Sequence, residues 1–157
     1  MKTKKSQRVK YPVGKLPQAD LVELLSRNTA ALGPRVILGP GLGRDAAVIE
    51  MSDRYLVVKT DPITFATDEI GWYVVNINAN DIACLGARPL WFIATVLLPE
   101  GQADRLMTER IFADLHTACA QLGVSIVGGH TEITHGIKRP ILVGAMLGEV
   151  NQQALVR

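Results

Sequence analysis

The chain has 157 residues, of which 48% are hydrophobic and 20% are charged. This length and composition indicate one globular domain and exclude a disordered chain. The formal net charge of +2 is too small to indicate nucleic acid as a partner. The longest apolar run, residues 90–98, is too short to span a bilayer, so we expect no membrane partner either.

Residues 1–16 are expected to form a basic N-terminal tail and loop, and residues 17–157 the folded domain. The tail is either a solvated end or a contact for phosphates. Cys84 and Cys119 are far apart in sequence, which argues against a disulfide framework or a zinc knuckle and favours a reduced, cytoplasmic location. Both lie in apolar helical contexts, where we expect buried, inert thiols.

The order of predicted elements is one helix followed by β-β-α-β-α-β-β. The first helix starts at Pro17 and ends near Gly33, and the glycine- and proline-rich segment 36–43 is expected to be a loop. The pattern then predicts strands over 46–51, 55–59, 89–98, 124–127 and 140–148, and helices over 69–85 and 104–122.

Two of these strands, 89–98 and 140–148, are apolar on both faces. Two long helices cover one face of a sheet, so the other face needs a second cover. We expect a second copy of the chain to provide it, because an exposed apolar sheet face promotes aggregation. The alternative is that the first helix and the loop up to Gly43 cover this face.

Two aspartates flank the predicted hairpin. Asp45 follows a glycine-rich loop and precedes the first strand, while Asp61 follows the second strand. A hairpin brings the start of its first strand and the end of its second strand together, so these carboxylates are predicted to be neighbours. The alternative is that Asp45 is a turn residue and Asp61 a cap before Pro62.

A third carboxylate lies within an apolar helix. Asn78 and Asp81 are three residues apart and share a face, with Asn80 beside them. A carboxylate in such surroundings is costly unless it is paired or binds a metal, although a structural role for Asp81 is the alternative. If Asp45, Asp61 and Asp81 converge, a hard cation such as Mg²⁺ would neutralise them.

A glycine pair follows the predicted strand 124–127. Gly128 and Gly129 allow close approach of a ligand to the backbone, and His130, Thr131 and Glu132 offer polar groups. The trio His130, Glu132 and His135 matches no zinc spacing. The glycines at 39, 41 and 43 precede a strand rather than a helix, which argues against a Rossmann fingerprint, and a P-loop is excluded because no Gly-Lys-Ser/Thr occurs.

Four segments together resemble the N-terminal domain of the aminoimidazole ribonucleotide (AIR) synthetase, or PurM, superfamily. They are Asp45-Ala46-Ala47-Val48, Thr60-Asp61-Pro62, the run from Asn80 to Pro89, and Gly128-Gly129-His130-Thr131-Glu132. The superfamily includes selenophosphate synthetase, thiamine-monophosphate kinase and the hydrogenase maturation protein HypE, and the chain is most similar to HypE-related AIR synthase-related proteins. The resemblance implies a two-layer α+β fold, with a four-stranded mixed sheet, helices on one face and dimerisation sheet to sheet.

The resemblance also implies an ATP and Mg²⁺ site. The aspartates that match the family's metal ligands are Asp45, Asp61 and Asp81. The residues expected at the nucleotide and its phosphates are Lys15, Gly41, Gly43, Asn78, Asn80, Gly128, Gly129, His130 and Thr131. Lys15 is equally compatible with a solvated side chain, and no residue is assigned a catalytic role.

Two functions follow from this resemblance. The first is the ATP-binding half of an enzyme that transfers the γ-phosphate to an amide or similar oxygen. The second is a non-catalytic nucleotide-binding dimerisation module. Family members usually have a second domain of similar size, which we expect to be absent here, so a separate chain carrying that domain is a candidate partner. Arg44 stands where kinase-like members often have another aspartate, which weakens a thiamine-phosphate kinase assignment.

Overall fold

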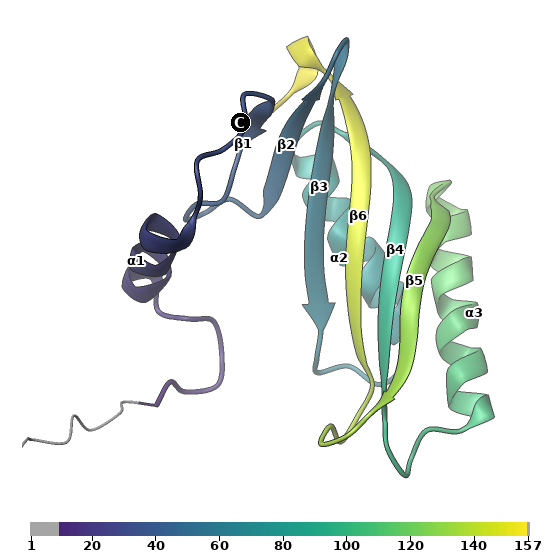
Figure 1. The fold of residues 1–157 in the computed structure, drawn as a ribbon. Helices are drawn as coiled ribbons and strands as arrows, with labels where there is room; N and C mark the ends of the chain where they lie inside the picture. Colours follow the sequence, from purple (N-terminus) through teal and green to yellow (C-terminus); the bar gives the residue numbers. More distant parts are fainter. Residues whose placement is uncertain (1–9, 157) are drawn as a thin grey trace, which may run out of the picture.

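The computed structural model describes residues 10–156. A six-stranded sheet forms one layer and two helices form the other, both of them on the same face of the sheet (Figure 1). The strands are β1 (Val36–Leu38), β2 (Ala46–Met51), β3 (Arg54–Ile63), β4 (Arg88–Pro99), β5 (Ser125–Thr134) and β6 (Ile141–Asn151). The helices are α1 (Gln18–Asn28), α2 (Ile70–Cys84) and α3 (Arg105–Leu122), with a short 3-10 turn at Gln152–Ala154. Most of the basic tail lies outside the described residues.

The strands lie in the order β1-β2-β3-β6-β4-β5. Only β4 and β5 run parallel, and α3 is the crossover between them, so the sheet is mixed as predicted. The predicted number of four strands is wrong. One reason is that 36–38, assigned to a loop because of the glycines and proline beyond it, pairs with β2 as a short edge strand. The other is that all five predicted strands join one sheet. In addition, β5 is longer than predicted, because it continues through the glycine pair.

The two long helices begin and end close to their predicted limits. The side chain of Asp104 caps α3 by accepting a hydrogen bond from the backbone N–H of Met107 at 2.7 Å. Gly123 ends this helix in the left-handed conformation, with φ at 65°. At the start of α2, Glu69 is the N-cap residue, with a φ of 53° and no hydrogen bond from its side chain to the helix.

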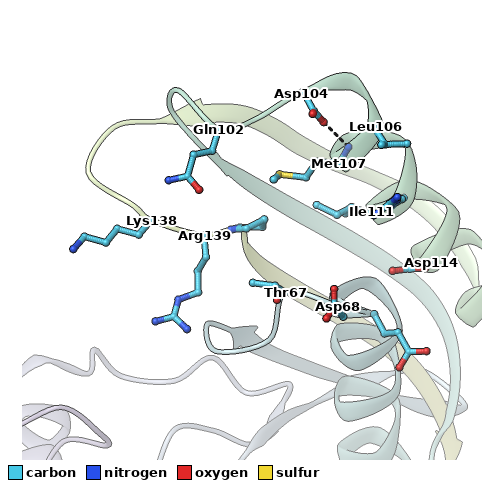
Figure 2. Close-up of a pocket in the computed structure, with 13 residues that line it drawn as sticks. Thr67, Asp68, Gln102, Asp104, Leu106, Met107, Ile111, Asp114, Lys138 and Arg139 are labelled. Atoms are coloured by element: carbon cyan, nitrogen blue, oxygen red, sulfur yellow. Dashed lines mark hydrogen bonds between the residues drawn. The ribbon is translucent and has the colours of Figure 1, made fainter.

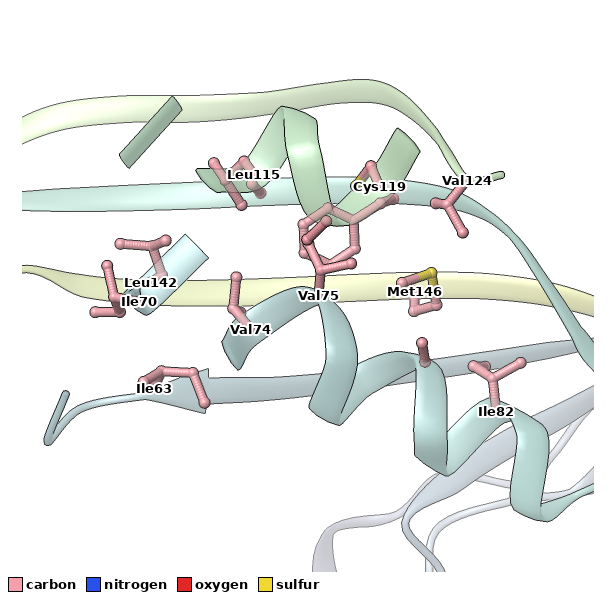
Figure 3. Packing of buried hydrophobic residues seen from close by; sticks show 14 of the residues in the cluster. Ile63, Ile70, Val74, Val75, Ile82, Leu115, Cys119, Val124, Leu142 and Met146 are labelled. Carbon is pink, nitrogen blue, oxygen red and sulfur yellow. The ribbon is translucent and has the colours of Figure 1, made fainter. Parts of the chain in front are cut away.

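The core lies between the helices and the sheet (Figure 3). Val74 and Val75 of α2 and Leu115 of α3 meet Phe92 and Met146 of the sheet, and all five side chains are at most 3% exposed. The two helices approach closely at Gly71. A Cβ atom placed there would lie 2.7 Å from the backbone nitrogen of Leu115.

The other face of the sheet has no cover among residues 10–156. Helix α1 has no buried residue and lies apart from the sheet (Figure 1), so the alternative in which the first helix covers this face is not supported. The face is apolar, and Ile93 near its middle is 38% exposed. We call this face the open face. Its apolar side chains are Ile49, Leu56, Val58, Ile93, Leu97, Val143, Ala145 and Leu147.

In the part of the chain that the structure describes, we find no helix that is both long and apolar enough to cross a membrane.

Candidate functional site

The β2–β3 hairpin brings Asp45 and Asp61 together, as the sequence predicts. A tight turn at Ser52 and Asp53 sets a register in which Ala46 lies opposite Lys59. Asp45 therefore lies beside the segment that contains Asp61. The prediction that Asp61 ends its strand is wrong, because β3 continues to Ile63 by pairing with β6, where Asp61 lies opposite Gly144.

The third carboxylate comes from α2, and a lysine lies at the centre of all three. Asp81 Oδ2 lies 3.0 Å from Lys59 Nζ, Asp61 Oδ2 lies 3.6 Å from it and Asp45 Oδ1 lies 3.9 Å from it. Lys59 is only 6% exposed, whereas the Asp45 side chain is 74% exposed. We call these four residues the aspartate–lysine cluster.

The pKa of Lys59 shows which effect dominates in this cluster. Burial alone would lower it, because a buried ammonium loses its hydration. The hydrogen bond to Asp81 and the negative charges of Asp61, Asp81 and Asp45 act in the opposite direction. Together they outweigh burial and raise the pKa above its ordinary value, so Lys59 is a cation at neutral pH.

Sequence reasoning missed Lys59, although a signal for it exists. Side chains alternate along a strand, so Lys59 points to the same side as the buried Val57 and Ile63. A lysine in the inward register of an apolar strand needs anionic partners, and two aspartates flank the same hairpin.

The donor set fits a hard divalent cation in its chemistry, because carboxylate oxygens are the ligands that Mg²⁺ prefers. The spacing is different from that of a metal site. Among residues 10–156, no three His, Cys, Asp or Glu side chains are grouped closely enough to hold an ion. The three aspartates are instead spaced around an ammonium group.

A pocket of 580 Å³ opens beside this cluster. It lies between the β1–β2 edge of the sheet and the C-terminal end of α2. Its lining combines apolar and polar groups, which are Ile37, Leu38, Gly43, Arg44, Asp45, Ala46, Asp81, Cys84 and Leu85. The prediction of a buried Cys84 is wrong, because this thiol is exposed at the end of α2, whereas Cys119 is buried as predicted.

The other residues predicted at the nucleotide differ in their surroundings. Asn78 is fully buried, and its Nδ2 donates to the backbone oxygens of Val74 and Asp61 at 2.8 and 3.3 Å. It therefore fixes α2 against β3 underneath the cluster. Asn80 is exposed on the same helix, Gly41 is half-buried in the loop before β2, and Lys15 is exposed in the segment before α1.

The structure does not bring Gly128, Gly129, His130 and Thr131 to the aspartates. The glycines lie within β5 rather than in a loop, at the far edge of the sheet. Gly129 pairs with Ala94, Ala94 with Gly144, and Gly144 with Asp61, which places the segment three strands, or about 14 Å, from Asp61. Its side chains pair locally, since His130 Nε2 lies 3.0 Å from Glu132 Oε2, and this contact with the imidazole lowers the pKa of Glu132.

A second pocket, of 470 Å³, lies at the opposite end of α2 (Figure 2). The helix has 15 residues, so about 22 Å separates its two ends. Acidic groups such as Asp68 and Asp114 line this pocket together with basic groups such as Arg110, Lys138 and Arg139. It contains none of the predicted site residues, and its mixed charge favours no particular ligand.

The fold and the cluster define a class of protein, namely two-layer α+β domains with convergent aspartates beside a pocket at a sheet edge. Within that class, the family described as "AIR synthase related protein, N-terminal domain" matches residues 43–150. The chain belongs to this family, which confirms the resemblance drawn from its motifs.

Curated relatives show the range of the family. A putative hydrogenase expression/formation protein of Methanocaldococcus jannaschii is 27% identical over 150 residues, which cover 92% of this chain and 44% of that protein. A thiamine-monophosphate kinase of Archaeoglobus fulgidus is 23% identical, with 87% of this chain and 46% of the kinase covered. The chain therefore spans less than half the length of these relatives.

Solved structures share the fold. PurLQS from Thermotoga maritima superposes with a TM-score of 0.76 at 22% identity, over 97% of this chain and 29% of that one. Thermotoga maritima PurL complexed with AMPPCP, an ATP analogue, gives a TM-score of 0.73 at 22% identity, with coverage of 97% and 29%. A HypE–HypF complex is 25% identical with a TM-score of 0.61, covering 71% of this chain and 38% of that one.

Proposed function

We propose that this chain is the ATP- and Mg²⁺-binding half of a phosphoryl-transfer enzyme of the AIR synthase/HypE type. Such an enzyme activates an amide or similar oxygen with the γ-phosphate of ATP. The observation that carries the proposal is the convergence of Asp45, Asp61 and Asp81 beside a pocket of 580 Å³. An ATP-analogue complex among the proteins that share the fold supports it.

In this proposal the three aspartates hold Mg²⁺, and the metal neutralises charge on the phosphates when it is bound. Gly43 lines the pocket with a φ of 73°, a conformation that favours glycine and leaves its backbone open to a phosphate. Gly41 and the side chain of Arg44 lie in the same loop. The roles of Lys15, Asn80 and the segment 128–131 in nucleotide binding stay predictions.

We further propose that the complete site needs additional protein. The cluster is open to solvent at Asp45, and phosphoryl transfer requires that water be excluded and the acceptor be held in line. A second domain or a separate chain is one contribution, in keeping with the longer relatives. A second copy of this chain, packed against the open face, is the other.

The alternative is a non-catalytic nucleotide-binding dimerisation module. The ion pair between Lys59 and Asp81 favours it, since Lys59 compensates part of the charge of the aspartates without a metal. Acceptor-dependent phosphate release, measured with the additional domain or chain present, separates the two functions, because a non-catalytic module binds the nucleotide and releases no phosphate.

Binding is tested with Asp81→Asn. Calorimetry should show that the wild type binds Mg·AMPPCP and that this variant binds it at least about tenfold more weakly, because a metal ligand is lost. Its unfolding midpoint should change little, since Asp45 and Asp61 still face Lys59. Asp68→Asn, in the pocket at the other end of α2, is the matched control and should bind normally. Equal affinities of wild type and Asp81→Asn would make Asp81 a structural residue.

A further inference from the structure

Lys59 occupies the space that a metal ion would need. One ammonium group faces three carboxylates, so the aspartate–lysine cluster keeps two uncompensated negative charges. That remaining charge attracts a divalent cation. The lysine is 6% exposed and lies on the inner side of the cluster, while the aspartates extend toward solvent and the pocket.

The distances put Lys59 and a divalent cation in competition. Carboxylate oxygens bind Mg²⁺ at about 2.0–2.1 Å. In the cluster the three oxygens lie 3.0, 3.6 and 3.9 Å from Nζ, a spacing that suits an ammonium group and is too wide for Mg²⁺. Closing these oxygens around Mg²⁺ would bring two positive groups within a few ångströms of each other, where they repel strongly. Lys59 therefore has to withdraw as the cation binds.

A withdrawn ammonium group needs a new anionic partner. The pocket beside the cluster is lined by Asp45 and Asp81, the outermost and the nearest of the carboxylates that Lys59 faces. A phosphate bound there with the cation would lie beside Asp81, whose carboxylate is 3.0 Å from the Lys59 ammonium group. A lysine is suited to this exchange, because its flexible stem carries a single point charge.

We propose that Lys59 is the internal cation of the aspartate–lysine cluster. Its ammonium group leaves the carboxylates when the divalent cation binds and pairs instead with the phosphate of the nucleotide. Lys59 is thus a positioning residue that makes the cation and the nucleotide bind together rather than singly. The inference rests on the proposed function, because it assumes that the cluster binds Mg²⁺ with ATP.

The proposal predicts a specific change in binding when the charge is removed. In Lys59→Met no ammonium has to be displaced, so MgCl₂ alone should bind about tenfold more tightly than to the wild type. The coupling between Mg²⁺ and AMPPCP should fall, because the phosphate has lost its lysine. Lys59→Arg keeps the charge and should retain the weak binding of Mg²⁺ alone. A lysine that stayed in place would also weaken Mg²⁺ binding through its charge, but its replacement would leave the coupling between Mg²⁺ and AMPPCP unchanged.

The experiment measures Mg²⁺ affinity by calorimetry, with and without AMPPCP, in the wild type, Lys59→Met and Lys59→Arg. Tighter Mg²⁺ binding and reduced coupling in Lys59→Met alone support the proposal. Affinity for Mg²⁺ equal to or weaker than that of the wild type overturns it. A Lys59→Met protein that folds only with Mg²⁺ also supports it, since the cation then replaces the lysine.

If Lys59→Met does not fold with or without Mg²⁺, the proposal is tested on the wild type instead. Mass spectrometry can follow the rate at which an amine-reactive reagent modifies Lys59. Saturating MgCl₂ without nucleotide should increase this rate, because the ammonium leaves its buried position, and an unchanged or slower rate overturns the proposal. A wild type that does not bind Mg·AMPPCP contradicts the proposed function itself. If the wild type binds Mg·AMPPCP but Lys59→Met binds Mg²⁺ no more tightly than the wild type does, only this inference is contradicted.

Discussion

Cys84 and Cys119 lie in very different surroundings although both are helical. Cys84 is exposed and lines the pocket beside the aspartates, whereas Cys119 is 2% exposed in the core. Burial raises the pKa of Cys119 to about 11, so almost none of it is thiolate at neutral pH. A thiol-reactive dye should therefore modify Cys84 quickly and Cys119 slowly. Mg·AMPPCP should slow the fast phase in proportion to the occupied fraction.

Cys84→Ser is the control for this labelling experiment, because only the slow phase should remain. The readout is absorbance of the released dye against time, with and without ligand. If saturating nucleotide leaves the fast phase unchanged while calorimetry shows binding, the nucleotide occupies a different part of the molecule.

At the scale of single residues, the sequence predicts which residues lie close together more reliably than it predicts their roles. The convergence of Asp45 and Asp61 follows from hairpin geometry alone, and the structure confirms it. The sequence did not predict the role of Lys59 or the exposure of Cys84, because each depends on contacts between distant segments. Lys59 is explained only when Asp81 of α2 packs against β3, and Cys84 only when the end of that helix borders a pocket.

Among the elements, β5 gives the glycine pair a structural explanation. A Cβ atom at Gly129 would clash with the carbonyl oxygen of Ala94 in β4, whereas one at Gly128 would meet nothing within 4 Å. Gly129→Ala should therefore lower the free energy of unfolding by about 2 kcal/mol, because backbone cannot move aside as a side chain can. Gly128→Ala should change it by less than about 0.5 kcal/mol.

Urea denaturation followed by circular dichroism compares these two variants with the wild type. The pair is well matched, since the same substitution is made at neighbouring positions of one strand. Equal stability of the two variants would contradict the close approach of β4 and β5. If Gly128→Ala is stable yet weakens Mg·AMPPCP binding, the segment contacts the nucleotide despite its distance from Asp61.

Element types could be predicted from the sequence more reliably than strand limits. Periodicity and capping residues locate α2 and α3 within a residue or so, because helix ends are determined locally. Strand ends depend on partners that lie far away in the sequence. Pro62 remains in β3 because β6 runs beside it, and Gly128 remains in β5 because β4 does. The short β1 exists only through its pairing with β2.

For the whole molecule, the open face is the feature that most needs an explanation. Two helices cover one side of the sheet, and within residues 10–156 nothing covers the other. Apolar side chains from β2, β3, β4 and β6 form this surface. Contiguous apolar surfaces of this kind in soluble proteins usually mark an interface. A second copy of the chain suits it, because identical faces related by a two-fold axis are self-complementary in composition.

The dimer is tested by placing a charge in the middle of the open face. Ile93 is 38% exposed there, so Ile93→Lys should leave the fold intact yet put an ammonium group into an apolar interface, where it has no partner. Light scattering at micromolar concentration should give the mass of two chains for the wild type and of one chain for this variant. Leu106→Lys is the control, because Leu106 is 56% exposed on α3, in the helical layer, and should leave the dimer unchanged. A wild type that is monomeric at this concentration would contradict the dimer.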